Sequence, residues 1–170
     1  MDRVSITLHS CARTATRDVD YSMAPCDDAG RVGFISDNGC MVDRNVMGGE
    51  LEPCGTDPVT GFFRVGCCTT GPEDFGSHTI CAVVTAEFLE HQKNIGNDLT
   101  RPMPHYGFPG LVPGDRWCVT AANWLRSHHD GAAAYVVLAS TPERALEIVP
   151  LEVLREHAVD VPFGPGDLEA

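Results

Sequence analysis

The chain has 170 residues, of which 43% are hydrophobic and 21% are charged, a balance typical of one folded domain. Its 24 Asp and Glu residues outnumber its 12 Lys and Arg residues, which gives a formal net charge of −12. A nucleic-acid binder needs a basic face, so this charge argues against nucleic acid and against an anionic membrane surface as partners. No apolar run approaches about 18 residues, so we expect no membrane-spanning helix.

The first 40 residues mix Ser, Thr, Asp and Arg with single apolar residues and show no helical pattern. Within them, residues 4–8 alternate as a strand does. We therefore predict a poorly ordered N-terminal extension over residues 1–40. A single globular domain over 41–158 and a flexible tail over 159–170 complete the predicted organisation.

The next segment is dense in glycine and proline turn signals, which predicts ordered loops over residues 41–78. Residues 79–84 form a short β-branched run that is typical of a buried strand. Thr85 is a suitable N-cap for a helix over 86–95. Gly96 follows at the position where a left-handed C-cap is expected.

The second half of the chain predicts further helices and a strand. Spacings of three and four predict a helix that begins between Trp117 and Thr120, with Asp115 as its N-cap, and ends at Gly131. A strand is expected over 135–138. The remaining expected elements are a helical turn opened by Thr141 and Pro142, a strand end at Ile148 and Val149, and a last helix from Pro150.

This order of elements predicts the α+β class. We expect a small single-domain sandwich, built from a short mixed sheet, three or four helices and long ordered loops. The fold class alone indicates no activity, and the oligomeric state is not encoded in these patterns.

The eight cysteines are interpreted from the expected compartment. The first 25 residues contain no apolar core of the kind that a signal peptide needs, so a cytoplasmic protein is expected. Thiols stay reduced there. A cysteine cluster then indicates a metal site, redox chemistry, or small side chains that fill the core.

A zinc site is one hypothesis for these cysteines. Zinc needs about four sulfur or nitrogen ligands in a tetrahedron. His78 and Cys81 have the spacing of a ligand pair, but no Cys-x-x-Cys pair occurs, and Cys81 lies within a predicted strand, which indicates burial. The metal-ligand candidates are Cys54, Cys67, His78, Cys81 and Cys118.

A catalytic thiol is a second hypothesis, and it places the chain among the enzymes. Cys67 and Cys68 follow an arginine in a glycine-rich loop, the setting that lowers the pKa of a thiol. His78 and Asp74 could supply the base and the third group of a nucleophilic triad. The alternative is that the cysteines only fill space beside glycines.

A small-molecule pocket is a third hypothesis. Arg64, Asp74, Ser77 and His78 are polar residues flanked by glycines, as binding residues on a scaffold often are. Asp98 is assigned to turn capping instead. The pair His128 and His129 lies near a helix end, where it is expected to complement the helix dipole rather than bind a metal.

Several motifs in the expected domain occur together in one known family. They are Asn-Val-Met-Gly at 45–48, Leu-Glu-Pro-Cys at 51–54, Thr-Gly-Phe-Phe-Arg at 60–64, Gly-Cys-Cys at 66–68, Thr-Gly-Pro-Glu-Asp at 70–74, Gly-Ser-His at 76–78 and Pro-Gly-Asp-Arg-Trp-Cys at 113–118. Over residues 44–158 the chain resembles the uncharacterised family named domain of unknown function 2237. The resemblance implies a compact single domain without an established activity.

The chain departs from the pattern of that family at a few positions. Many members have a second cysteine where this chain has Thr120, a serine where it has Gly55, and prolines where it has Ala133 and Ala134. A site that needed the missing cysteine would be incomplete here.

These observations lead to three function hypotheses. The first is a cytoplasmic domain that binds a small ligand or a metal, with zinc as the possible cofactor, through the loop region with Cys, His and Asp side chains. The second is an enzyme whose nucleophile is Cys67 or Cys68. The third is a structural or interaction module whose acidic surface keeps it in solution.

Overall fold

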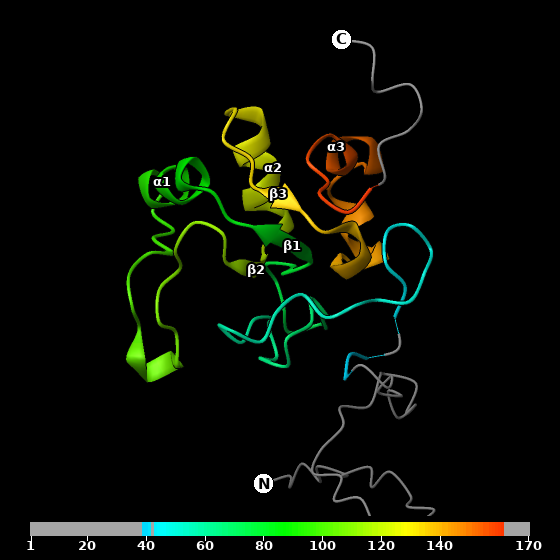
Figure 1. Ribbon diagram of the computed structural model, residues 1–170, viewed down its shortest axis with the longest axis horizontal. Helices are drawn as coiled ribbons and strands as arrows, with labels where there is room; N and C mark the ends of the chain where they lie inside the picture. Colours follow the sequence, from blue (N-terminus) through cyan, green and yellow to red (C-terminus); the bar gives the residue numbers. More distant parts are fainter. Residues whose placement is uncertain (1–38, 42, 162–170) are drawn as a thin grey trace, which may run out of the picture. The chain divides into compact units, whose positions relative to one another are not determined.

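The computed structural model describes residues 39–41 and 43–161. The described residues belong to one unit of the chain, 35–170. Its helices and strands are β1 (Ile80–Val83), α1 (Ala86–Asn94), β2 (Arg116–Val119), α2 (Ala121–His129), β3 (Tyr135–Val136) and α3 (Leu151–Glu156), with the short 3-10 helices η1 (Pro104–Tyr106), η2 (Leu138–Ser140) and η3 (Glu143–Glu147) (Figure 1). The strand predicted over residues 4–8 lies outside the described residues.

The three strands form one sheet in the order β2-β1-β3, and both neighbours of β1 run antiparallel to it. The α+β class is therefore confirmed, but the prediction of a mixed sheet was wrong. The connection from β1 to β2 contains α1, and the connection from β2 to β3 contains α2. Both outer strands pair only with β1 and run opposite to it, so no parallel pair forms among these three strands. In the described part of the chain, no helix is both long and apolar enough to cross a bilayer.

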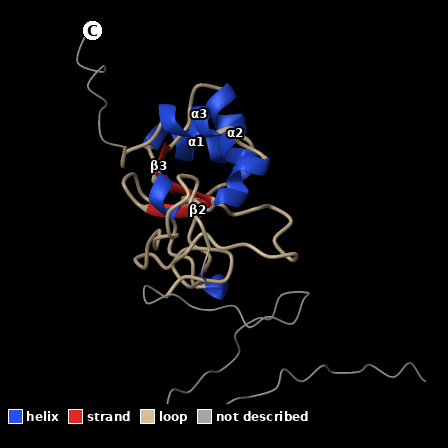
Figure 2. Ribbon diagram, turned by 90° about the vertical axis from the view of Figure 1, so that its right-hand side faces the viewer, coloured by secondary structure: helices blue, strands red, loops and turns tan. Residues whose placement is uncertain are grey.

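The sheet has two different faces. Ile80 and Ala82 of β1 belong to the main apolar core, whereas Cys81 belongs to a smaller core of four cysteines and Val137. This alternation follows from the two-residue period of a strand. Figure 2 shows the α-helices on one side of the sheet and the long loops on the other, so β1 separates a helix layer from a loop layer.

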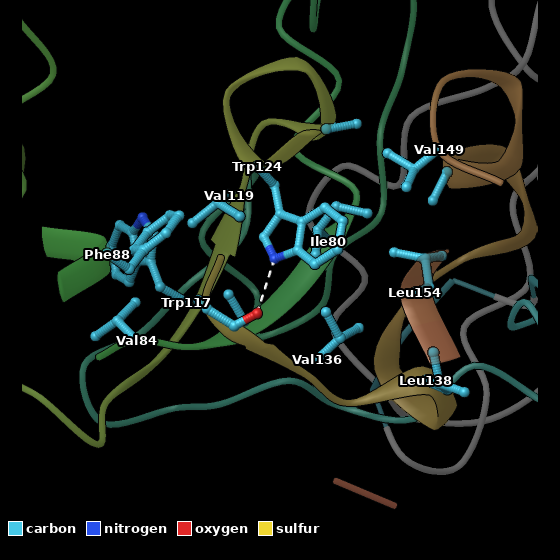
Figure 3. Close-up of a cluster of buried hydrophobic side chains, with 14 of the residues drawn as sticks. Ile80, Val84, Phe88, Trp117, Val119, Trp124, Val136, Leu138, Val149 and Leu154 are labelled. Atoms are coloured by element: carbon cyan, nitrogen blue, oxygen red, sulfur yellow. Dashed lines mark hydrogen bonds between the residues drawn. The ribbon is translucent and has the colours of Figure 1, made fainter. Parts of the chain in front are cut away.

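Buried aromatic side chains pack in the core of the helix layer. Trp124 of α2 is fully buried, and its indole Nε1 donates a hydrogen bond to the carbonyl of Ala134 at 3.0 Å (Figure 3). Phe108 and Trp117 pack with their ring centroids 5.0 Å apart. A buried indole needs such an acceptor, because an unpaired N–H in this core would cost about 1–3 kcal/mol.

Helix α1 confirms its prediction closely because its signals are local. The hydroxyl of Thr85 accepts a hydrogen bond from the backbone N–H of Phe88, and Gly96 has a φ of 90° just past the C-cap. The prediction for Trp117 was wrong: it lies in β2, and α2 begins only at Ala121. The helical spacing from Trp117 to Trp124 arises because both face the same core from consecutive elements.

Other boundaries also moved. Asp115 does not cap a helix; its carboxylate accepts from the N–H of Val112 in a turn. The strand expected over 135–138 ends at Val136, and the strand end expected at Ile148 is the C-cap of η3. The helical turn after Thr141 is η3, with Pro142 as its N-cap.

Candidate functional site

The loop layer holds a histidine on a buried carboxylate. Asp74 Oδ1 lies 2.7 Å from His78 Nδ1, while Asp74 Oδ2 accepts from the backbone N–H of His78 at 2.7 Å and from the hydroxyl of Thr70 at 2.9 Å. The side chain of Asp74 is fully buried, whereas that of His78 is 36% exposed. The carboxylate therefore fixes an imidazole whose other edge reaches the surface.

The surroundings of Asp74 keep it ionised. Burial alone raises its pKa, but hydrogen bonds from the backbone and ring of His78 and from Thr70 outweigh burial and hold the pKa below its ordinary value. An ionised carboxylate only accepts hydrogen bonds, so Nδ1 of His78 carries the proton. In the neutral ring, Nε2 is then the nitrogen with a lone pair, and within the described chain it has no hydrogen-bond partner.

The same loop contains unusual backbone. Arg64 and Ser77 have φ values of 56° and 52°, and they are the non-glycine residues with positive φ among those described. Such conformations cost of order 1–3 kcal/mol each and are concentrated at functional sites. Backbone hydrogen bonds hold Ser77 in place. Its N–H donates to the backbone carbonyl of Asp74, and its own carbonyl accepts from the N–H of Ala121, the first residue of α2.

Exposed aromatic side chains lie on the same loop as His78, and one of them packs near its ring. The ring centroid of Phe62 is 5.8 Å from that of His78 and 5.1 Å from that of Phe63. Phe75 is 98% exposed. The guanidinium of Arg64 lies 4.7 Å from the ring centroid of Trp117. We call the exposed parts of Phe62, Phe63, Arg64, Phe75 and His78 the loop face.

One buried hydroxyl beneath this loop is unsatisfied. Oγ1 of Thr69 is the buried side-chain polar atom without a hydrogen-bond partner in the described part of the chain. Natural proteins rarely leave such atoms unpaired, and the exceptions tend to have a reason. Thr69 lies directly before Thr70, which donates to Asp74.

Among the described residues, six cysteines form three disulfides, which differs from the expectation of reduced thiols. The pairs are Cys40–Cys67, Cys54–Cys81 and Cys68–Cys118. The side chains of adjacent residues diverge, so Cys67 and Cys68 bond to partners in different segments. The two cysteines proposed as nucleophiles are buried and bonded, and in this form neither offers a thiolate.

Four of these sulfurs lie together on the loop side of the sheet. Cys81 and Cys118 are register partners on β1 and β2, and their N–H groups donate to the hydroxyls of Thr141 and Thr60. They therefore form a non-hydrogen-bonded pair, whose side chains approach closely. The sulfur atoms of Cys54, Cys68 and Cys118 all lie within 4.8 Å of one another. We call Cys54, Cys68, Cys81 and Cys118 the sulfur cluster.

The comparison with protein-family models identifies the family of this chain. A family model described as an uncharacterised protein conserved in bacteria, DUF2237, matches residues 44–158. The chain belongs to the DUF2237 family. The suspected family is thus confirmed, and no curated protein matches the chain. The matched range contains the loop face and the whole sulfur cluster, whereas Cys40 lies before it.

The structure places the proposed site residues of this DUF2237 domain in two groups. Asp74 and His78 are in direct contact, and Ser77 adjoins them in sequence. Arg64 belongs to the same loop, but its guanidinium lies over Trp117 of β2. Of the metal-ligand candidates, Cys54, Cys81 and Cys118 belong to the sulfur cluster. Cys67 instead forms a disulfide with Cys40, and His78 is hydrogen-bonded to Asp74.

Some contributing residues had not been singled out. Cys68 was not among the metal-ligand candidates, because adjacent cysteines rarely supply two ligands to one ion; its partner Cys118 is 50 residues away. Thr70 and Phe62 had only their position in the loop to mark them. Asp98 is confirmed as a turn cap, since its carboxylate accepts from the N–H and hydroxyl of Thr100, and these bonds lower its pKa.

A groove also lies outside this site, between α1 and the connection that leads to β2. None of the predicted site residues lines it. Its lining residues are Ala86, Leu89, Glu90, Lys93, Asn94, Thr100, Leu111, Val112 and Pro113.

Proposed function

We propose that this DUF2237 domain binds a small molecule on the loop face, with His78 as the central contact. The observation that carries the proposal is the Asp74–His78 pair, in which a fully buried carboxylate orients a partly exposed imidazole. The strained backbone at Arg64 and Ser77 and the orphaned hydroxyl of Thr69 support the same location.

The chemistry of this pair defines the class of ligand. With the proton on Nδ1, Nε2 of His78 accepts a hydrogen bond from a ligand hydroxyl or removes a weakly acidic proton. Phe62 packs near the imidazole ring and Phe63 packs on Phe62, so the two exposed rings offer apolar contact area beside His78. We therefore expect a small molecule with a hydroxyl group or another proton donor and an apolar body.

Ligand binding fits this geometry better than cysteine catalysis. A nucleophilic thiolate needs a base within hydrogen-bond reach, and Cys67 and Cys68 would first have to be reduced. A purely structural module is the remaining alternative. It would need no exposed imidazole edge beside exposed phenylalanines.

The test is a fragment screen by NMR against the full chain labelled with ¹⁵N. Hydroxyl-bearing aromatic fragments should shift Nε2 of His78 and the amides of Phe62 and Phe63. The His78→Asn variant should abolish these shifts, because the Asn amide still donates to Asp74 but lacks Nε2. The matched control, His105→Asn, changes an exposed histidine in η1 and should bind normally.

Two results would contradict the proposal. One is that no fragment shifts His78 at millimolar concentration. The other is that His78→Asn binds the same fragments as the wild type, because contact with the phenylalanines alone would then explain the shifts. Either result would favour the structural module.

We propose zinc binding by the sulfur cluster as a second function, for the reduced chain. Four thiolates at about 2.3 Å from a tetrahedral zinc lie about 3.8 Å apart, and the clustering of Cys54, Cys68 and Cys118 within 4.8 Å supports this arrangement. Cys81 is the fourth sulfur, through its bond to Cys54. Zinc and the two disulfides are mutually exclusive, because both use the same sulfur atoms.

Metal analysis and thiol counting test this second function together with the compartment. The expectation of a cytoplasmic protein goes with a reduced cluster that holds one zinc per chain, whereas persistent disulfides favour an oxidising compartment. Chain isolated from its natural source should be trapped with iodoacetamide and weighed. Cys54→Ser should lower the zinc content of the reduced chain by one ion, and Cys40→Ser should leave it unchanged. A reduced chain refolded with zinc that holds no more zinc than the same chain with alkylated thiols would contradict the proposal.

A further inference from the structure

The C-terminal ends of α2 and α3 bring two histidines together, outside the loop layer. His128 is in the last turn of α2 and His157 is the C-cap of α3. Nδ1 of His128 lies 3.0 Å from Nε2 of His157. One ligand atom each from His128, Glu156 and His157 lies within 4.8 Å of the other two.

Both imidazoles are positioned by the core. The ring of His128 stacks on Trp124 with 6.0 Å between centroids and 10° between planes, while His157 meets Trp124 edge-on at 5.4 Å. Trp124 is itself fully buried and hydrogen-bonded. The backbone of His157 is fixed too, because its carbonyl accepts from the N–H of Val136. The two rings are thus preorganised by packing rather than held only by each other.

The separation of the two nitrogens suits a metal ion. Zinc binds imidazole nitrogen at about 2.0–2.1 Å, so two nitrogens on one tetrahedral zinc lie about 3.3 Å apart. The observed 3.0 Å is within a few tenths of an ångström of that value. At present the two facing nitrogens share one proton; for both to bind a metal, the donating ring must carry its proton on its other nitrogen.

The charges around the pair also favour a cation. Glu156 supplies a carboxylate, and the carbonyl end of α2 presents the negative pole of its helix dipole. Two histidines and one glutamate make three protein ligands, a set that leaves the fourth position of zinc for water or another small ligand. Imidazole with carboxylate suits zinc and its neighbours better than calcium or magnesium.

We propose that His128, Glu156 and His157 form a binding site for a zinc-class divalent cation. The site is independent of the loop face and of the sulfur cluster. It differs from the sequence-based expectation that His128 only complements a helix dipole. The sequence pattern did not indicate this site, because the partner imidazole lies 29 residues further along the chain.

Titration of the full, tag-free chain with Zn²⁺ tests the site. The chain should be oxidised, treated with EDTA and alkylated, so that no thiolate competes. Calorimetry should give one zinc per chain, and removing a ligand with His128→Ala, His157→Ala or Glu156→Gln should weaken binding by about tenfold or more. The matched controls, His129→Ala on α2 and Glu152→Gln on α3, should bind as the wild type does.

A second measurement keeps the test decisive, because the loss of His157 also removes packing from Trp124. Long-range ¹H–¹⁵N NMR of the wild type should show zinc shifting Nδ1 of His128 and Nε2 of His157 together, with His129 unmoved. Far-UV circular dichroism checks that each variant is folded. No saturable zinc binding, or shifts that spare either imidazole, would overturn the proposal.

Discussion

At the scale of single residues, Asp74 and His78 have different tasks although they share a hydrogen bond. Asp74 is fully buried and accepts three hydrogen bonds, so it holds the loop together. The side chain of His78 donates only one of these three hydrogen bonds, and the other edge of its ring lies at the surface. The pair therefore combines a structural role for Asp74, which we call the clasp, with a ring nitrogen of His78 presented at the surface.

This division predicts unequal effects of mutation. Asp74→Asn places an amide N–H against the donors of Thr70 and His78 that bond to the carboxylate in the wild type. This clash should lower the free energy of unfolding by about 1–3 kcal/mol. His78→Asn keeps a donor for Asp74 and should change stability by less than about 1 kcal/mol. Urea unfolding at pH 7 measures both. Equal large losses would mean that His78 is only part of the clasp.

The lowered pKa of Asp74 adds a pH dependence. A carboxyl whose folded pKa is depressed stabilises the fold above its unfolded pKa of about 3.9, and this contribution disappears as the pH falls through the folded value. The stability difference between wild type and Asp74→Asn should thus be constant from pH 7 to pH 5 and shrink below pH 4. A difference that does not change down to pH 2.5 would exclude this linkage.

Thr120 lies close to His78, at the position where the family resemblance implies a second cysteine. A Cβ on Gly76 would be 2.9 Å from the methyl of Thr120 and 3.3 Å from Cε1 of His78. Thr120 is also the N-cap of α2, where a helix lowers the pKa of a thiol. Thr120→Cys should therefore introduce a thiol that iodoacetamide alkylates quickly near pH 7.

The role of His78 in that reactivity can be isolated. Mass mapping of position 120 should show several-fold slower alkylation when Thr120→Cys is combined with His78→Asn. Equal rates in the two backgrounds would show that only the helix end acts on the thiol. The wild-type chain, which has no thiol at this position, is the baseline.

At the scale of elements, local signals were predicted well and non-local ones were not. Helix α1 carries both of its caps in its own sequence, so its limits could be predicted. Strand β2 owes its conformation to pairing with β1, more than 30 residues earlier, and its Trp117 was assigned to a helix. Asp74 and His78 are only four residues apart and in contact, so their grouping could be proposed from the sequence, while their role in binding stays a prediction. Disulfide partners and the His128–His157 contact join distant segments, so spacing could not reveal them.

The bond between Cys40 and Cys67 crosses the expected domain boundary at Met41. A disulfide that closes a loop of 27 residues stabilises by about 3–4 kcal/mol in the chain-entropy description. A chain beginning at Met41 should therefore melt well below one beginning at Gly39, when both are oxidised. Under reducing conditions the two should melt alike. Equal melting temperatures in the oxidised state would show that this bond contributes little.

At the scale of the whole described unit, the sheet divides two layers that are stabilised differently. The helix layer has a continuous apolar core that includes Phe88, Trp117, Trp124 and Leu154. The loop layer has no regular helix or strand between residues 43 and 79. Two of its three disulfides, Cys54–Cys81 and Cys68–Cys118, fasten it directly to strands β1 and β2. A loop layer of this kind can keep strained residues in place because cross-links replace packing.

The last prediction follows from this division of labour. In the reduced chain without zinc, hydrogen exchange should accelerate for peptides within residues 54–78 more than for peptides of α2. The loop amides depend on backbone hydrogen bonds, such as those from Cys54 N–H to the carbonyl of Gly66 and from Gly66 N–H to the carbonyl of Thr60. These bonds open once reduction of the disulfides releases the loop from the strands. The amides of α2 remain covered by the core around Trp124. Mass spectrometry of exchange in the oxidised and reduced chains measures both. Uniform acceleration would show that the disulfides hold the whole fold, and no acceleration would show that the loop hydrogen bonds suffice without them.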